Sequence, residues 1–327
     1  DKPIHHIEKI SGRGNSSIHK IIALDGSSYA LKHYPDQLKD KRLRLNTEFQ
    51  TLQILHENNI NNVPKSVEKS DDLNLGLYEW INGDNIGKPS VNALDQAIGF
   101  VEQLYSLSQK IDGNHIDIAS EACLSANELA SQIENRLLRL KQESKRFQEL
   151  STFLERTFEP LWAKVKDENI SLWPLESRYK SLPKEKQILS PSDFGFHNCL
   201  KGNDGSLTFL DFDYFGRDDP VKLTADFIWH PAMNLSAELK EKWQEAMLDL
   251  FSNDPQFESR LNAAMPLYGL RWATIVLNEF LPGYTDRRQK AGEPESYDPL
   301  KSQTIQLDKA KLICSKVRAM GSLTAFA

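Results

Sequence analysis

The stretch SPSDFGFHNCLKGNDGSLTFLDFD, residues 190–213, concentrates polar chemistry in one short part of the chain. Asn198 follows Asp193 by five positions, and Asp211 follows it by eighteen. The run GNDG at 202–205 is a strong turn signal between two short apolar runs, so it predicts a hairpin. Such a hairpin would return Asp211 to the loop that contains Asp193 and Asn198. Two carboxylates and an amide form the oxygen-rich site that magnesium prefers, and Asp193 is then free to accept a proton from an attacking hydroxyl. The alternative is a hairpin capped by polar turn residues.

A lysine on an upstream strand extends this pattern. In YALKHY, residues 29–34, strand alternation places Ala30, Lys32 and Tyr34 on one face. The small side chain of Ala30 leaves room for a flat base, and the Lys32 ammonium can reach phosphate oxygens. Ala30 and Lys32 together therefore suit a nucleotide-binding site. The alternative is a surface lysine on an edge strand.

Two further features flank that lysine. Gly12 and Gly14, in ISGRGNSSI, allow the backbone to approach a phosphate closely, although a turn is the simpler interpretation of two glycines alone. Glu48 lies beside the apolar stripe of a predicted helix. A carboxylate there can hold the Lys32 ammonium in place. The alternative for Glu48 is a solvated helix residue.

The chain changes character near residue 84. Before it, the strand-like runs 18–24 and 27–34 flank Asp25-Gly26, which supplies the positive φ angles of a tight hairpin turn. A helix with apolar residues from Leu45 to Leu55 and a strand near 74–80 follow. After residue 84 the pattern is mainly helical, interrupted by the hairpin described above. We therefore expect an α+β protein of two lobes, residues 1–83 and 84–327. The helices expected after residue 84 span 92–110, 119–142, 147–167, 237–253, 258–281 and 304–318.

The composition disfavours several classes of protein. The 327 residues are 26% charged with a net charge of −6, so we expect no nucleic-acid or membrane partner, since both favour a basic surface. We interpret the basic run KDKRLRL, 39–45, as the solvated start of the following helix.

No stretch approaches the roughly 18 apolar residues of a membrane span, and the N-terminus lacks the apolar core of a signal peptide. Three widely spaced cysteines and eight scattered histidines form no disulfide framework or metal motif. We expect a cytoplasmic protein without an obligate protein partner.

The order of these features resembles the protein-kinase-like fold, and more closely the aminoglycoside phosphotransferase family of small-molecule kinases. YALK is similar to the kinase lysine strand, and LYEWINGDNI, 77–86, to the hinge strand of that family. SDFGFHN resembles its catalytic loop. FLDFDYFGRDDPVKLTADF, 209–227, resembles its metal-binding aspartate followed by a Gly…Asp-Pro…Asp segment. The resemblance covers about residues 5–230.

The resemblance implies a role for each of these residues. Asp193 is implied as the catalytic base or hydroxyl-orienting residue, and Asn198 and Asp211 as magnesium ligands. Asp226 would brace the catalytic loop from a following helix. Lobe 1–83 would bind the nucleotide, and lobe 84–327 would contain the catalytic loop and the acceptor-binding region. The implied nucleotide-binding residues are Gly12, Gly14, Ala30, Lys32, Glu48, Glu79, Trp80 and Ile81.

Two features of the opening stretch need comment. Pro191 stands where the family usually has a histidine that holds the loop, and proline can stiffen the loop by fixing φ. The literal Asp-Phe-Gly at 193–195 matches the metal-binding triplet of protein kinases only in spelling. That interpretation requires a catalytic aspartate and asparagine about eighteen residues earlier, and residues 170–186 contain neither.

The resemblance leads to a function. Asp211 is followed after eight residues by Asp219-Pro220, the predicted N-cap and first-turn proline of a helix. This leaves no room for the activation segment of a protein kinase. We therefore expect magnesium-dependent transfer of the γ-phosphoryl group of ATP, or another nucleoside triphosphate, to a hydroxyl of a small molecule such as a sugar, amino alcohol or glycoside. The alternative, motivated by Pro191, is a catalytically inactive nucleotide-binding protein of the same fold. Three polar residues of the apolar helix at 269–284 are either acceptor contacts or core-helix residues: Arg271, Asn278 and Glu279.

Overall fold

The computed structural model describes residues 2–10, 16–36, 40–111, 116–284 and 298–323. The chain forms two compact units. The first comprises residues 1–121, 189–217 and 286–297, and the second comprises 122–188, 218–285 and 298–327. The predicted lobe division at residues 83/84 stays a prediction.

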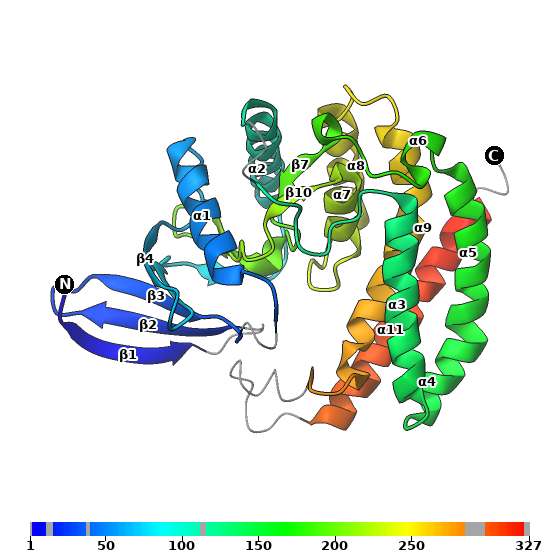
Figure 1. Ribbon diagram of the computed structural model, residues 1–327, viewed down its shortest axis with the longest axis horizontal. Coiled ribbons are helices and arrows are strands. Elements are labelled where there is room, and N and C mark those ends of the chain that lie inside the picture. The colour runs from blue at the N-terminus through cyan, green and yellow to red at the C-terminus, as the bar shows by residue number, and fades with distance from the viewer. Residues whose placement is uncertain (1, 11–15, 37–39, 112–115, 285–297, 324–327) are drawn as a thin grey trace. The chain divides into compact units, whose positions relative to one another are not determined.

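A five-stranded antiparallel sheet forms the N-terminal part of the first unit (Figure 1). The hairpin predicted at Asp25-Gly26 is confirmed, and Gly26 has the positive φ, 80°, that this turn requires. Helix α1 (Arg44–Glu57) packs against β4 and β5 of this sheet with its apolar stripe buried. The strands, in their order across the sheet, are β1 (Ile4–Ile10), β2 (Ser17–Ala23), β3 (Ser28–His33), β5 (Leu75–Glu79) and β4 (Ser66–Ser70).

The sheet register places Ala30 and Lys32, the two strand residues expected to bind the nucleotide, on one face. Ala30 pairs with Lys20 on one side and Tyr78 on the other, while Lys32 pairs with Gly76. Residues directly opposite each other in antiparallel strands share a face. Ala30, Lys32 and Tyr78 therefore project to the same side of the sheet.

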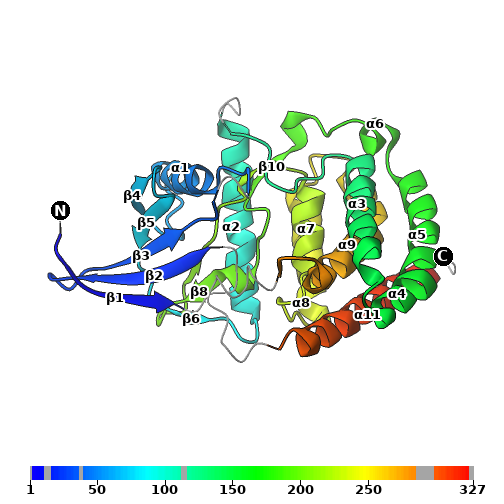
Figure 2. The same cartoon turned by 60° about the horizontal axis from the view of Figure 1, so that its bottom comes forward.

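The predicted second hairpin is also confirmed, as β8 (Cys199–Lys201) and β9 (Leu207–Phe209). It is extended by β6 (Asp84–Asn85) into a three-stranded sheet beside α2 (Val91–Lys110) (Figure 2). Gly83 permits this pairing, because a Cβ at that position would lie 2.8 Å from the main-chain oxygen of Lys201. Gln96 of α2 accepts a hydrogen bond from the Leu207 amide at 2.8 Å, so the helix and the hairpin form one support.

The second unit is helical and is built around α9 (Phe257–Val276), which packs against α3, α5, α7 and α11 (Figure 1). Two short strands form a further pair: β7 (Ile188–Ser190) and β10 (Gly216–Asp218). The boundaries between the units at 188/189 and 217/218 fall within these strands. The remaining elements are α3 (Ala126–Ser144), α4 (Gln148–Phe153), the π-helix η2 (Leu154–Phe158), α5 (Glu159–Leu172), α6 (Leu175–Arg178), η3 (Lys184–Lys186), η4 (Phe196–Asn198, in the first unit), α7 (Pro220–Trp229), α8 (Ala237–Leu250), η5 (Leu277–Phe280) and α11 (Pro299–Leu323).

Most predicted helices are found, and two begin several residues away from their predicted starts. α11 begins at residue 299, whereas the sequence pattern predicts 304. α3 begins at residue 126, whereas the sequence pattern predicts 119. The Ser125 hydroxyl accepts from the Glu128 amide at 3.2 Å, and the Leu124 amide donates to the Glu128 carboxylate at 2.7 Å, so these two capping contacts set the boundary. The α+β class is confirmed, with an antiparallel sheet near the N-terminus and a larger helical part. Among the described residues, no helix has the length and apolar character needed to cross a bilayer.

Candidate functional site

Lys32 is the meeting point of three segments of the first unit. Its ammonium lies 2.6 Å from Oε2 of Glu48 on α1 and 2.5 Å from Oδ1 of Asp211, which follows β9. The Lys32 side chain is only 10% exposed. Burial alone would lower its pKa, but the carboxylates of Asp211 and Glu48 raise the pKa well above its ordinary value. Lys32 is therefore a fixed cation, and the interpretation as a surface lysine is wrong.

Glu48 is held from several directions. Besides Lys32, its Oε2 accepts from the Tyr34 hydroxyl at 2.6 Å, and Tyr34 in turn lies 2.6 Å from the Tyr78 hydroxyl. The Phe212 amide donates to Oε1 at 3.4 Å. Glu48 is 5% exposed, which excludes the solvated-helix alternative. The two tyrosines are neighbours of the candidate site, and strand alternation places Tyr34 on the same face as Lys32.

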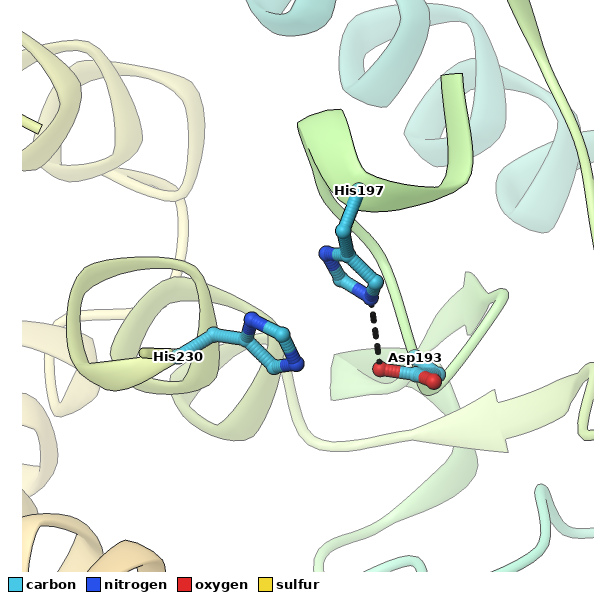
Figure 3. A group of neighbouring side chains, drawn as sticks. All are labelled: Asp193, His197 and His230. Carbon is cyan, nitrogen blue, oxygen red and sulfur yellow. Dashed lines mark hydrogen bonds and ion pairs between the residues drawn. The ribbon is translucent and has the colours of Figure 1, made fainter. Parts of the chain in front are cut away.

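The loop before β8 presents Asp193 with a side chain 47% exposed. Nε2 of His197 lies 3.1 Å from Oδ1 of Asp193, as drawn in Figure 3, where His230 of the second unit is also shown. The Asn198 amide nitrogen donates to the main-chain oxygen of Asp193 at 3.0 Å. His197 was not singled out in the sequence. It lies four residues after Asp193, in the short 3-10 helix η4.

Serines hold this loop at the position where the family histidine is replaced by Pro191. The Ser190 hydroxyl accepts from the Ser192 amide at 3.0 Å, and the Ser192 hydroxyl donates to the Ser120 main-chain oxygen at 2.7 Å. Ser192 has a φ of 66°, in the left-handed region that non-glycine residues occupy only at a cost. The Asp193 amide donates to the Pro191 oxygen at 2.8 Å. These contacts fix the backbone that leads into Asp193.

Asn198 and Asp211 are neighbours through the main chain, since the Leu210 amide donates to the Asn198 oxygen at 2.9 Å. The Asn198 amide nitrogen is engaged by Asp193, so its side-chain oxygen is the atom left for a ligand. The Asp211 side chain is 42% exposed. One carboxylate and one amide oxygen, both hard donors, fit a magnesium ion that keeps its other positions for water and phosphate.

An aromatic cluster supports both aspartates from the apolar side. Phe100 of α2 stacks on Phe194 and Phe209, with centroid distances of 5.7 and 4.4 Å, and meets the Phe212 ring edge-on at 6.2 Å. Phe194 follows Asp193 and Phe212 follows Asp211, so each candidate carboxylate precedes a residue packed on the Phe100 ring. Such packing restricts how far either carboxylate can move.

In the basic run 39–45, of which Lys39 lies outside the described residues, Lys41 is exposed, but Arg44 is not the solvated helix residue that the sequence suggests. Arg44 is 3% exposed, and its Nη1 donates to the Asp213 carboxylate at 2.6 Å while its Nε donates to Asp40 at 2.8 Å. The sequence-based interpretation failed because the balancing carboxylate of Asp213 lies 169 residues further along the chain. Burial and the Asp211 charge raise the pKa of Asp213 to about 7, while Lys32 and Arg44 oppose the rise.

The predicted adenine-binding segment follows β5. Trp80 donates from Nε1 to Asn82 at 3.1 Å, and the Lys20 ammonium lies 4.6 Å from the Trp80 ring centroid. The Glu79 carboxylate accepts from the Lys65 amide at 3.2 Å, and Ile81 is half-buried. Their contacts with a nucleotide stay predictions. Gly12 and Gly14 lie outside the described residues.

Asp226 and the polar residues of the 269–284 helix belong to the second unit. Asp226 binds Arg271 at 3.2 Å, the Trp272 indole at 2.7 Å and Lys222 at 3.1 Å. Arg271 and Glu279 are buried, which favours the core-helix interpretation over acceptor contacts. The expected bracing of the catalytic loop by Asp226 stays a prediction.

Comparison with known proteins identifies the fold. No family model and no curated protein sequence matches the chain. Among solved structures, a spectinomycin phosphotransferase in complex with ADP and spectinomycin has 14% identity and a TM-score of 0.62, over 96% of this chain and 94% of that one. An ethanolamine kinase of Plasmodium vivax has 15% identity and a TM-score of 0.59, over 96% and 84%. An amicoumacin kinase in complex with AMP-PNP and Ca²⁺ has 14% identity and a TM-score of 0.57, over 95% and 88%.

At these identities the similarity shows the fold. The chain has the fold shared by aminoglycoside phosphotransferases and choline/ethanolamine kinases, as the sequence resemblance predicted.

Proposed function

We propose that this chain is an ATP-dependent phosphotransferase that moves the γ-phosphoryl group to a hydroxyl of a small molecule. The observation that carries the proposal is the Lys32 ammonium bound to both Glu48 and Asp211, in the unit that also presents Asp193. The fold supports it, since solved relatives of that fold are kinases in complex with ADP or AMP-PNP.

Each residue has a chemical task in this proposal. Lys32 binds phosphate oxygens of the nucleotide, and Glu48 holds Lys32 in place. Asp193 orients the acceptor hydroxyl and takes its proton, because its carboxylate is half exposed while His197 fixes one of its oxygens. Asn198 and Asp211 would hold magnesium, which supplies charge neutralisation at the phosphates.

The same proposal assigns the remaining nucleotide contacts. The main chain at Glu79, Trp80 and Ile81 meets the adenine, beside the small side chain of Ala30. Gly12 and Gly14 approach the phosphates.

The short connection between Asp211 and helix α7 favours a small molecule over a protein as the phosphoryl acceptor. The Asp219 carboxylate accepts from the Val221 amide at 2.9 Å, and Pro220 begins α7, so the N-cap of the helix lies eight residues after Asp211, as predicted. A protein kinase needs a longer segment there to bind a peptide. We propose a sugar, amino alcohol or glycoside as acceptor.

The alternative is a nucleotide-binding protein of the same fold without turnover, which Pro191 motivates. The contacts of Ser190 and Ser192 favour an active enzyme, because they supply the loop support that the family histidine provides elsewhere. Asp193 and Asp211 both keep exposed carboxylate surface, which catalysis requires.

A thermal-shift titration with Mg·ATP, followed by an acceptor screen, tests the proposal. We expect Mg·ATP to raise the midpoint of unfolding, and at least one hydroxyl compound to give ADP and a phosphorylated product. The Asp193→Asn variant is the control for background hydrolysis. Stabilisation without turnover on the whole panel would favour the binding protein, and the absence of stabilisation by any nucleoside triphosphate would contradict both functions.

A further inference from the structure

Asp211 has a backbone conformation that its neighbours must impose. Its φ is 67°, in the left-handed region, which costs a non-glycine residue about 1 kcal/mol or more. On the preceding side, the Leu210 amide is bound to Asn198. On the following side, the Phe212 amide donates to Glu48, and Asp213 and Tyr214 provide a second restraint through Arg44.

Five residues form that second restraint, which we call the Arg44 cluster: Asp40, Arg42, Arg44, Asp213 and Tyr214. Arg44 uses all three guanidinium nitrogens, at 2.8 Å to Asp40, 2.6 Å to Asp213 and 2.9 Å to the Tyr214 hydroxyl. Arg42 donates to the Tyr214 hydroxyl at 2.8 Å and to Asp40 at 2.7 Å. The guanidinium groups of Arg44 and Arg42 lie 4.5 and 4.8 Å from the Tyr214 ring centroid.

The cluster connects the proposed metal ligand to the helix that holds Lys32. Arg44 and Glu48 are four residues apart on α1, so their side chains lie on one face of the helix. That face binds Phe212 through Glu48 and Asp213 through Arg44. One helix face thus holds the two residues that follow Asp211.

We propose that Arg44 is a positioning residue that acts through Asp213 to hold the Asp211 carboxylate in the geometry needed for magnesium. The inference rests on the proposed function. In this role Arg44 acts through its protein partners, by setting the backbone from which the metal ligand projects. A planar guanidinium with three partners fixes orientation in a way that a lysine ammonium cannot reproduce.

The magnesium dependence of ATP binding tests this role without an acceptor. Dissociation constants for ATP are measured by calorimetry with excess Mg²⁺ and with EDTA, and their ratio is the enhancement by magnesium. Arg44→Gln should lower that ratio about tenfold, as loss of an outer residue commonly does at metal sites, while the constant in EDTA stays within about twofold. Arg44→Lys should recover part of the ratio. Tyr214→Phe, which keeps the ring and removes one acceptor, should lower it less than Arg44→Gln does.

Arg260→Lys is the matched control, because Arg260 is equally buried and binds Asp219 at 3.0 Å in the second unit. It should lower thermal stability and leave the magnesium ratio unchanged. An unchanged ratio in Arg44→Gln, or an equal loss of affinity with and without Mg²⁺, would overturn the inference while leaving the proposed function standing. If Arg44→Gln does not fold, Arg44→Lys and Tyr214→Phe decide, and a wild-type ratio in both overturns the role. A wild-type chain that binds no Mg·ATP would overturn the proposed function and this inference together.

Discussion

Asp193 and Asp211 have different neighbours and should respond differently to the same substitution. Asp193 is bound by His197, whereas Asp211 is bound by Lys32 and lies beside the main chain of Asn198. Asp193→Asn should reduce phosphoryl transfer by at least about a hundredfold and leave the affinity for Mg·ATP unchanged. Asp211→Asn should weaken Mg·ATP binding itself. Calorimetry with Mg·ATP, together with turnover on an acceptor found by screening, measures both. Loss of metal-dependent binding in Asp193→Asn, with binding intact in Asp211→Asn, would show that the two roles are reversed.

The sequence predicted the residues that motif spacing defines and missed those that only the tertiary structure brings near. Lys32, Glu48 and Asp211 were predicted because each occupies a fixed place in a strand, helix or hairpin pattern. Arg44 was misinterpreted, since nothing in its local sequence distinguishes a buried guanidinium from a solvated one. Its burial depends on Asp213, whose position near α1 follows from the fold and not from local preference.

At the scale of elements, caps and periodicity were the informative signals. The Asp25-Gly26 turn and the Asp219-Pro220 helix start were predicted with their correct positions. The displaced start of α3 was not predicted, because Ala119 and Cys123 are buried in non-helical backbone and extend the apolar pattern beyond the helix. The spacing of apolar residues indicates burial, whereas the capping contacts of Ser125 and Glu128 indicate the boundary of the helix.

The N-terminus of α7 gives a prediction at this scale. Asp219 caps the helix and also pairs with buried Arg260 at 3.0 Å. Asp219→Ala should lower the free energy of unfolding by about 3–5 kcal/mol, because it removes a cap and leaves a buried guanidinium with one partner fewer. Asp219→Asn keeps the capping oxygen and should cost less.

Ser236→Ala removes the cap of α8 without an ion pair and provides the comparison, at about 1 kcal/mol. Urea denaturation measures the three variants. Equal losses for Asp219→Ala and Ser236→Ala would show that the Arg260 pair contributes nothing.

At the scale of the whole molecule, stability should depend on a buried carboxyl. Burial raises the pKa of Asp218 to about 6, although Lys222, 3.3 Å away, opposes the rise. Between about pH 4 and 6 the folded chain holds a proton on Asp218 that the unfolded chain releases. The contribution of Asp218 to stability therefore falls as pH rises through this window, by at most about 3 kcal/mol.

Asp218→Asn removes that titration, and Asp226 still pairs with Lys222 at 3.1 Å. The free energy of unfolding of the variant, relative to wild type, should therefore increase from pH 4 to pH 7 in urea titrations. The exposed Asp204 is the control of opposite sign, because hydrogen bonds from Ser206 lower its pKa. Its replacement by Asn should make the difference more negative as pH rises toward about 4, the ordinary pKa of an aspartate, and should leave it nearly constant from pH 4 to pH 7. A difference that does not change with pH in Asp218→Asn would contradict the prediction.

The discontinuity of the first unit has a consequence for the order of events during synthesis. Lys32 and Asp211 are 179 residues apart, and the unit that contains both requires residues 189–217. On a ribosome that releases the chain from its N-terminus, Lys32 and Glu48 emerge long before their later partners Asp211 and Asp213. The charged face of the N-terminal sheet is therefore complete only after residues 211–213 have been synthesised. Closing so long a loop is entropically costly, so completion of the site should be a late and slow step of folding.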